Sequence, residues 1–317
     1  MAQTALVKPA AASGDWTVPQ DWAAYAPAEH ALWDKLFARQ SELLVGRATP
    51  AFLSGLDVLH LSKPGVPDFA ELSERLMKLT GWSVVAVPAF LNGLDVLHLS
   101  KPGVPDFAEL SERLTRLTGW SVVAVPGLVP DEVFFEHLAH RRFVAGRFLR
   151  RPDQIDYLEE PDVFHDVFGH VPLLSDPVFA DYMQAYGEGG LRAARLGATA
   201  RLARLYWHTV EFGLIQSEEG LRIYGAGIVS SKGESLYALE SQTPPRIAFD
   251  MPRVMRTRYK IDDYQGAYFV IDSFEGLLKL TLETDFAPLY RALADTPDIA
   301  PGEVVAADTL LTPGSQP

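Results

Sequence analysis

The sequence predicts one mainly helical α+β domain with a small β-sheet. Two long runs have the apolar spacing of helices: AEHALWDKLFARQSELLV at residues 28–45 and ARLARLYWHTVEFGLI at residues 200–215. The strand candidates are short, WSVVAV at 120–125 and YFVI at 268–271, and turn residues flank YFVI. A chain of 317 residues is long enough for one large domain or two modest ones with a substantial core.

The composition narrows the classes of partner and of site. A net charge of −13 argues against nucleic acid and acidic membrane surfaces as partners. No run of 18 apolar residues occurs, and the first residues lack a basic head followed by an apolar stretch, so we expect a cytoplasmic protein. The chain has no cysteine, which excludes disulfides and thiolate ligands and leaves His, Asp and Glu as the available metal ligands.

The two ends of the chain differ from the remainder. Residues 1–14 and 300–317 are rich in Ala, Pro, Gly, Ser and Thr and have little to bury. We therefore expect two disordered tails around a folded domain at 15–299.

A tandem duplication follows the first predicted helix. Residues 51–88 recur at 89–126 and differ only at Ser54/Asn92, Met77/Thr115 and Lys78/Arg116. Each copy is expected to form a short helix, a Lys-Pro-Gly turn, a second helix (68–79 or 106–117) and a strand. Two copies are too few for a solenoid, which needs about three or more units.

The duplication supplies two nearly identical segments for a position in the fold that only one of them can occupy. The second copy leads directly into GLVPDEVFFEHL, so its strand is expected in the native place. Two hypotheses remain open for the extra material: residues from Gly81 to about Pro105 are extruded on the surface, or the whole first copy is. The interpretation we favour for its origin is a cloning, assembly or design event without function.

The elements after the duplication are predicted from local patterns. A helix is expected from Asp131, with Asp131 near its N-cap, and another over 177–186. The glycine-rich stretches 187–197 and 224–235 are expected to be loops. YFVI is expected to be a strand, followed by a closing helix.

The stretch PDVFHDVFGHVP, residues 161–172, is a candidate metal motif. Its two histidines, His165 and His170, lie five residues apart. On an α-helix that spacing places them about 140° apart around the axis, too far to coordinate the same ion. Pro161 suits the first turn of a short helix, and Gly169 is expected to end it. Termination there would let the chain turn His170 back toward His165.

Glu211 is the candidate third ligand. It lies in an apolar helical run, where a carboxylate is costly unless a cation meets it. Two neutral imidazoles and one carboxylate suit non-haem Fe(II). Zinc is the competing metal, but the zincin signature requires histidines four apart. His208 could compete as a ligand, and we expect it to point away.

A plainer interpretation is available from the spacing alone. His165 and His170 could be helix-end histidines, and Glu211 could pair with Arg204 or another base. Three longer strings favour the metal site: YLEEPDVFHDVFGHVPLLSDPVFADYMQAYG, RLYWHTVEFGL and IYGAGIVSSKGES. Together they closely resemble the tetrahydropterin-dependent aromatic amino acid hydroxylases, most closely the bacterial members that act on phenylalanine. The resemblance runs from about Asp15 to Ile299 with one interruption, and that family carries the duplicated unit once.

The resemblance implies a role for particular residues. The metal ligands would be His165, His170 and Glu211. The pterin-binding positions would be the backbone of Gly127, Leu128 and Val129, the stacking ring of Phe134, and Ala203 and Tyr206. The substrate-binding positions would be Arg150 for the carboxylate, Tyr157, Trp207 beside the ring, Ser230, and Glu234 near the amino group.

The resemblance also implies the reaction. With Fe(II), a tetrahydropterin and O₂, such a catalytic domain converts L-phenylalanine to L-tyrosine. Tryptophan or tyrosine hydroxylation, a zinc hydrolase on the same ligands, and a metal-binding but inactive duplicated variant are the alternatives. The animal members' regulatory domain and carboxy-terminal heptads have no counterpart in this sequence, so a monomer is expected.

Overall fold

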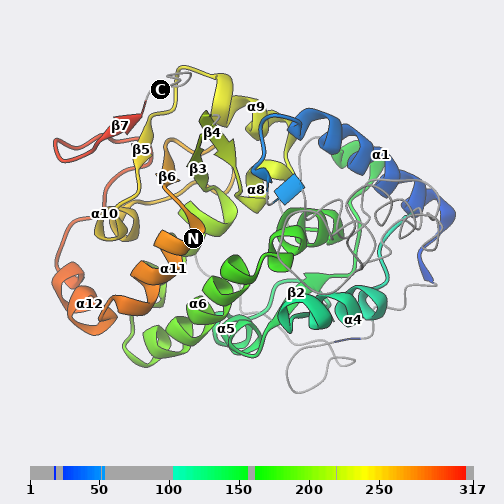
Figure 1. Ribbon diagram of the computed structural model, residues 1–317, viewed down its shortest axis with the longest axis horizontal. Helices are drawn as coiled ribbons and strands as arrows, with labels where there is room; N and C mark the ends of the chain where they lie inside the picture. The colour runs from blue at the N-terminus through cyan, green and yellow to red at the C-terminus, as the bar shows by residue number, and fades with distance from the viewer. Residues whose placement is uncertain are drawn as a thin grey trace, which may run out of the picture.

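The described part of the computed structural model is residue 18 and residues 24–50, 52–53, 103–155, 161–218 and 220–311. In the view of Figure 1 the larger sheet and the small β1–β2 pair lie on opposite sides of the molecule, and helix α6 runs between them. No helix within these ranges is long and apolar enough to cross a membrane.

Helices dominate the described residues, as predicted. The α-helices are α1 (Pro27–Leu44), α4 (Phe107–Thr118), α5 (Asp131–Ala139), α6 (Pro177–Arg195), α7 (Thr199–Tyr206), α8 (Ala226–Val229), α9 (Lys232–Glu240), α10 (Met251–Arg256), α11 (Phe274–Glu283) and α12 (Phe286–Ala294). Short 3₁₀ segments, η2 (Pro152–Gln154) and η4 (Val171–Ser175), and π-helical segments, η3 (His165–His170) and η5 (Trp207–Glu211), join them. The predicted helices at 28–45 and 106–117 are confirmed as α1 and α4, and the closing helix as α11.

The strands form two sheets. β1 (Ser121–Val125) and β2 (Arg142–Gly146) make a parallel pair. β3 (Leu214–Ser217), β4 (Gly220–Ile223), β5 (Arg246–Ala248), β6 (Tyr268–Ile271) and β7 (Leu310–Leu311) make a sheet in the order β4-β3-β6-β5-β7. The predicted strands at 120–125 and 268–271 are therefore confirmed as β1 and β6. Residues 268–271 are all buried at the centre of the five-stranded sheet, which explains their continuous apolar run.

The carboxy-terminal stretch is part of the fold, and the prediction of a disordered tail is wrong for residues 300–311. β7 pairs antiparallel with β5, and Asp308 accepts hydrogen bonds from the buried guanidinium of Arg253. Strand pairing and an ion pair hold this stretch although it has few apolar side chains to bury. The predicted tail residues 1–14 and 312–317 lie outside the described residues.

Helix α6 continues to Arg195, so the prediction of a loop at 187–197 is wrong for most of that stretch. Its glycines allow close packing instead of breaking the helix. A Cβ at Gly187 would clash with Leu138 and the Ala139 backbone, and one at Gly190 would clash with the ring of Phe135. These glycines let α5 lie directly against α6, at the cost of some helix propensity.

The stretch 224–235 is also helical where a loop was predicted. It forms α8 and the start of α9, separated by Ser230 and Ser231. Ser231 caps α9 by accepting a hydrogen bond from the Glu234 N–H. The two serines therefore mark a corner between helices.

Both copies of the duplicated unit contribute to the described core. Phe52, from the first copy, is fully buried, and its ring lies 5.8 Å from that of Phe168. Residues 103–126, from the second copy, supply α4 and β1. Gly103, Val104 and Pro105 are buried, so the hypothesised extrusion from Gly81 to about Pro105 does not include these three residues. The other residues in question, 54–102, lie outside the described ranges.

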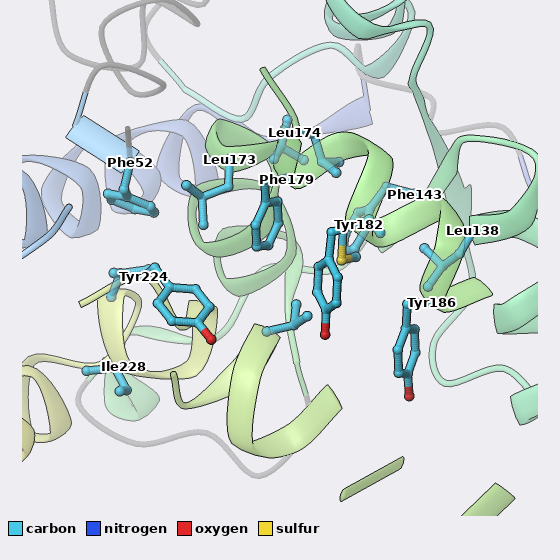
Figure 2. Packing of buried hydrophobic residues seen from close by; sticks show 14 of the residues in the cluster. Phe52, Leu138, Phe143, Leu173, Leu174, Phe179, Tyr182, Tyr186, Tyr224 and Ile228 are labelled. Carbon is cyan, nitrogen blue, oxygen red and sulfur yellow. The ribbon is translucent and has the colours of Figure 1, made fainter. Parts of the chain in front are cut away.

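Aromatic side chains fill the core beneath the site. Figure 2 shows Phe179, Tyr182 and Tyr186 lying along one face of α6. The Tyr182 hydroxyl lies 3.0 Å from Thr209 Oγ1, and the Tyr186 hydroxyl donates to the Leu202 carbonyl at 3.1 Å. Buried tyrosines thus retain hydrogen-bond partners while joining α6 to the segment 199–211.

Candidate metal centre

His165 and His170 are brought together by a π-helical turn, and the expected helix end at Gly169 is wrong. Segment η3 spans both histidines, and the chain continues without a break into η4. A π-turn closes i→i+5, so residues five apart lie on one face. The two Nε2 atoms are 3.3 Å apart. Pro161 precedes the turn, and Asp162 caps it by accepting from the His165 N–H at 3.0 Å.

Gly169 serves packing in this arrangement. A Cβ there would come against the carbonyl and the side chain of Ala226 in α8. The absence of a side chain lets α8 lie close to the π-turn, which places Ser230 beside His165.

Glu211 lies at the end of a second π-turn. The Phe212 N–H donates to the Trp207 carbonyl five residues back, at 2.9 Å. Glu211 Oε1 is 3.1 Å from His170 Nε2, and Oε2 is 3.6 Å from His165 Nε2. Among the described residues, these three form the one His/Asp/Glu group found with ligand atoms close enough to hold a metal, all within 4.8 Å of one another.

Burial favours a neutral His165 imidazole, and the neighbouring histidines favour an ionised Glu211 carboxylate. Burial lowers the pKa of His165 to about 4, although Glu211 acts in the opposite direction. Burial alone would raise the pKa of Glu211, but His170 and His165 outweigh it, and the net pKa is lowered. Neutral histidines and a carboxylate are the protonation states that a divalent cation requires.

Ser230 fixes the tautomer of His165. The serine hydroxyl has one proton, which it donates to the Ala226 carbonyl at 2.8 Å, so it accepts from His165 Nδ1 at 2.9 Å. With the proton on Nδ1, the Nε2 lone pair points toward Glu211 and His170. Such partners behind a ligand histidine orient the ring and raise its basicity. The donor set therefore fits a divalent cation.

Arg150 is held by a buried carboxylate. Asp162 accepts from Arg150 Nε at 2.8 Å and Nη2 at 2.9 Å, and from the Arg150 N–H at 2.9 Å. Burial would raise the pKa of Asp162, but Arg150 lowers it more strongly. Because Asp162 also caps the turn at His165, one carboxylate fixes both the arginine and the first histidine.

Glu234 lies in a second buried polar group. Its Oε1 accepts from the Tyr268 hydroxyl at 2.6 Å and from the Gln265 N–H at 3.0 Å. Burial raises the pKa of Glu234 to about 7. The Gln265 side chain in turn accepts from the Lys260 N–H and donates to the Lys260 carbonyl. The loop 260–265 is thereby tied to the start of α9.

Aromatic rings border the histidine cluster on another side. The Phe134 ring meets that of Tyr206 edge-on at 5.5 Å, and Tyr206 stacks at 6.3 Å from His170. Trp207 stacks on Tyr259 at 4.2 Å. These contacts place Tyr206 against His170 and Phe134 against Tyr206, whereas the ring of Trp207 packs on Tyr259. Gly127, Leu128, Val129 and Ala203 are all at least partly exposed.

Two further residues named in the sequence analysis are Tyr157 and His208. Tyr157 lies outside the described residues. His208 points away from the cluster, as expected: its Nε2 lies 3.3 Å from the Thr257 carbonyl. Sequence reasoning missed Asp162, Tyr259, Gln265 and Tyr268. Only Asp162 had a local signal, since an Asp just before a helical run is a typical N-cap.

The comparisons define the class of protein. Residues 97–286 match the family of biopterin-dependent aromatic amino acid hydroxylases. This chain belongs to that family. Its curated relatives include phenylalanine-4-hydroxylase from Caulobacter vibrioides, 53% identical over 97% of this chain and 92% of the relative. Phenylalanine-4-hydroxylase from Ralstonia nicotianae is 55% identical over 95% of this chain and 84% of the relative.

Solved structures of this family resemble the chain in fold and in sequence. Chromobacterium violaceum phenylalanine hydroxylase with bound iron(III) and 7,8-dihydrobiopterin has a TM-score of 0.79 and 48% identity, over 96% of this chain and 95% of the other. The same enzyme with bound iron and phenylalanine has a TM-score of 0.79 and 47% identity, over 94% of this chain and 95% of the other. The family assignment supports the iron oxygenase over the zinc hydrolase alternative.

Proposed function

We propose that this chain is a phenylalanine 4-monooxygenase that converts L-phenylalanine to L-tyrosine with O₂ and a tetrahydropterin at an Fe(II) site. The observation that carries the proposal is the convergence of His165 Nε2, His170 Nε2 and a Glu211 carboxylate within 4.8 Å, in a chain of this family. Close relatives are phenylalanine-4-hydroxylases, and a related structure holds both iron and phenylalanine.

His165, His170 and Glu211 would hold the iron on one face. Iron and a reduced pterin, when bound, activate O₂ for insertion into an aromatic ring. The protein's contribution is binding, orientation and exclusion of water. Three ligands on one face leave positions open on the other side of the ion. A neutral His165 and an ionised Glu211 are already in the protonation states that metal binding requires.

Arg150 is proposed to hold the substrate carboxylate. Asp162 occupies Nε and Nη2 of its guanidinium, whereas Nη1 lies 3.5 Å from the Ile155 carbonyl. A planar guanidinium fixed in this way presents a preformed donor to a carboxylate. Glu234, with Oε1 held by two donors, would face the substrate ammonium. Tyr157, Trp207 and Ser230 are proposed to border the same pocket.

The pterin is proposed to lie on the Phe134 side. Stacking against a flat heteroaromatic ring is a favourable role for a phenylalanine. The backbone of Gly127, Leu128 and Val129 would bind its polar edge, and Ala203 and Tyr206 would complete the surface. We further propose that the protein acts in the cytoplasm, supported by its lack of cysteine, and that it is a monomer, which light scattering after size exclusion would test.

The deciding experiment measures tyrosine formation from phenylalanine by the purified chain. It is run with Fe(II) and a tetrahydropterin together and with each left out. We expect product only when both are present. No product from any aromatic amino acid, despite stoichiometric bound iron, would overturn the proposed function and leave only metal binding.

A further inference from the structure

The second copy of the duplicated unit occupies a defined place, which we call the unit site: the position of residues 103–126 against α1, β2 and η4. The Gly103 N–H donates to Asp34 Oδ1 at 2.7 Å, and the Val104 N–H donates to His30 Nδ1 at 2.8 Å. At the far end of α4, Thr118 Oγ1 donates to the Leu174 carbonyl at 2.8 Å. Backbone groups and a few side chains thus fix the segment.

Strand pairing and apolar burial supply the other contacts. β1 pairs with β2 in parallel over five residues, from Ser121↔Arg142 to Val125↔Gly146. The Val18 N–H donates to the Ala124 carbonyl at 2.8 Å. The buried apolar side chains of the segment are Val104, Phe107, Leu110, Leu114, Trp120, Val122, Ala124 and Val125.

The first copy can make the same contacts. Residues 65–88 repeat residues 103–126 and differ only in Met77 for Thr115 and Lys78 for Arg116. Both positions, 115 and 116, are exposed on α4. The exchange would remove the hydrogen bond from Thr115 Oγ1 to the Trp120 carbonyl and would place Lys opposite the exposed Glu112. Every buried position is identical in the two copies.

The chain can connect either copy to its surroundings. Phe52 and Leu53 precede residues 65–88 as well as residues 103–126. In the observed arrangement, 49 residues, 54–102, connect Leu53 to Gly103. If the first copy occupied the unit site, residues 54–64 would make that connection, and 38 residues, 89–126, would lie between Pro88 and Gly127. Loop-closure entropy depends only weakly on length. The junction is open, since Pro126 and Gly127 are partly exposed and a Cβ at Gly127 would meet nothing within 4 Å.

We propose that the unit site accepts either copy, so that residues 65–88 of the same chain compete with residues 103–126 for it. The two arrangements have the same buried contacts and differ in where the extra 38 residues leave the fold. With the first copy bound, they leave beside Gly127–Val129. If the proposed function is correct, that arrangement retains the metal ligands but binds the pterin more weakly.

A matched set of substitutions tests this competition. Leu114 is fully buried in the unit site, and Leu76 is its counterpart in the first copy. An aspartate cannot be buried there without partners. We expect Leu76→Asp and Leu114→Asp each to unfold cooperatively by circular dichroism, within about 5 °C of the parent, and the double variant to lose the transition. A Leu114→Asp variant as unfolded as the double variant would overturn the proposal.

Proteolysis identifies the bound copy without relying on activity. Only the first copy has Lys78, and only the second has Arg116. We expect cleavage after Arg116 to be at least roughly tenfold faster in Leu114→Asp than in Leu76→Asp, with the reverse order after Lys78, because a segment outside the fold is cut more readily. Unchanged cleavage at both sites would overturn the proposal. So would a Leu114→Asp variant that folds only as a dimer, since the segment would then come from a second chain.

Discussion

The metal centre and the unit site both join distant segments, but their tolerance of substitution differs. The metal centre depends on three side chains whose atoms must converge, two of them placed by one π-turn and the third by another. The unit site depends on backbone hydrogen bonds and a set of apolar contacts. The chain contains one sequence that fits the metal centre and two that fit the unit site.

This difference shows how two kinds of specificity arise. Backbone pairing and burial accept any segment with the right pattern, so a duplication there produces a competitor. A largely buried cluster of charged and metal-binding groups accepts no substitute, because an unpaired charge or lone pair with little access to water is costly. Substitutions in the metal centre should therefore have the largest effects, and substitutions at the positions that distinguish the two copies should have the smallest.

The largest effect is expected for Glu211→Gln. A neutral amide removes the carboxylate that faces His165 and His170, and with it the charge that favours a divalent cation. We expect loss of iron retention and of tyrosine formation together, measured by metal analysis and by product assay. Glu218→Gln, at an exposed position, is the control. Full activity in Glu211→Gln would remove this residue from the site.

A large effect on stability is expected for Asp162→Asn. The change leaves the buried Arg150 guanidinium without a charged partner and weakens the cap at His165. Breaking a buried ion pair costs about 3 kcal/mol of the free energy of unfolding or more, which urea denaturation measures. The adjacent pair Arg151–Asp153 is exposed, so Asp153→Asn should leave the denaturation midpoint unchanged. Equal effects in the two variants would show that Asp162 is not a buried anchor.

A moderate, pH-dependent effect is expected for His208→Phe. Burial lowers the pKa of His208 to about 4, with Arg253 and Arg204 acting in the same direction. Because the unfolded chain binds this proton below about pH 6.5, the parent loses stability as the pH falls from 6.5 toward 4. By pH 5 that loss amounts to about 2 kcal/mol from this residue.

The His208→Phe variant should not lose the roughly 2 kcal/mol that protonation of His208 in the unfolded chain costs the parent at pH 5. Urea denaturation of the metal-free proteins at pH 5 and pH 7.5 measures the change in unfolding free energy of each protein, and the two changes should differ by that amount. A parent and a variant with the same change in unfolding free energy between the two pH values would mean that His208 does not contribute. His165, whose pKa is also lowered, is present in both proteins, so its contribution cancels.

Local patterns predicted much of the fold and of the candidate site. Helices α1, α4 and α11 and strands β1 and β6 were predicted because their apolar residues follow one period and their ends carry turn or capping residues. The three residues of the metal centre were predicted from residue type and resemblance. For the helices and strands, the pattern that predicts each element lies within a few residues of it.

The errors share a different cause. Gly169 and Gly190 were interpreted as chain breakers, but each is required by the close approach of a distant element, α8 in one case and α5 in the other. The π-turn at His165–His170 depends on that packing, which spacing alone does not reveal. Asp162–Arg150 and Gln265–Glu234 are pairs 12 and 31 residues apart in the sequence. Residues 300–311 are ordered by strand pairing and by Arg253, with few apolar side chains to signal it.

The smallest effect is expected for Thr115→Met, which makes the second copy more like the first. The exposed threonine loses one hydrogen bond, to the Trp120 carbonyl at 3.0 Å, so stability should fall by about 0.5–1 kcal/mol. Met77→Thr, the reverse change in the first copy, is the control. If the copies compete, Thr115→Met and Met77→Thr should each raise cleavage after Arg116 and lower it after Lys78 by similar amounts, because both change the free-energy difference between the two arrangements by the same hydrogen bond. The two variants differ in overall stability, which Thr115→Met lowers and Met77→Thr does not. A loss above about 2 kcal/mol would show that position 115 is specific to the second copy, and the near-equality of the two arrangements would fail.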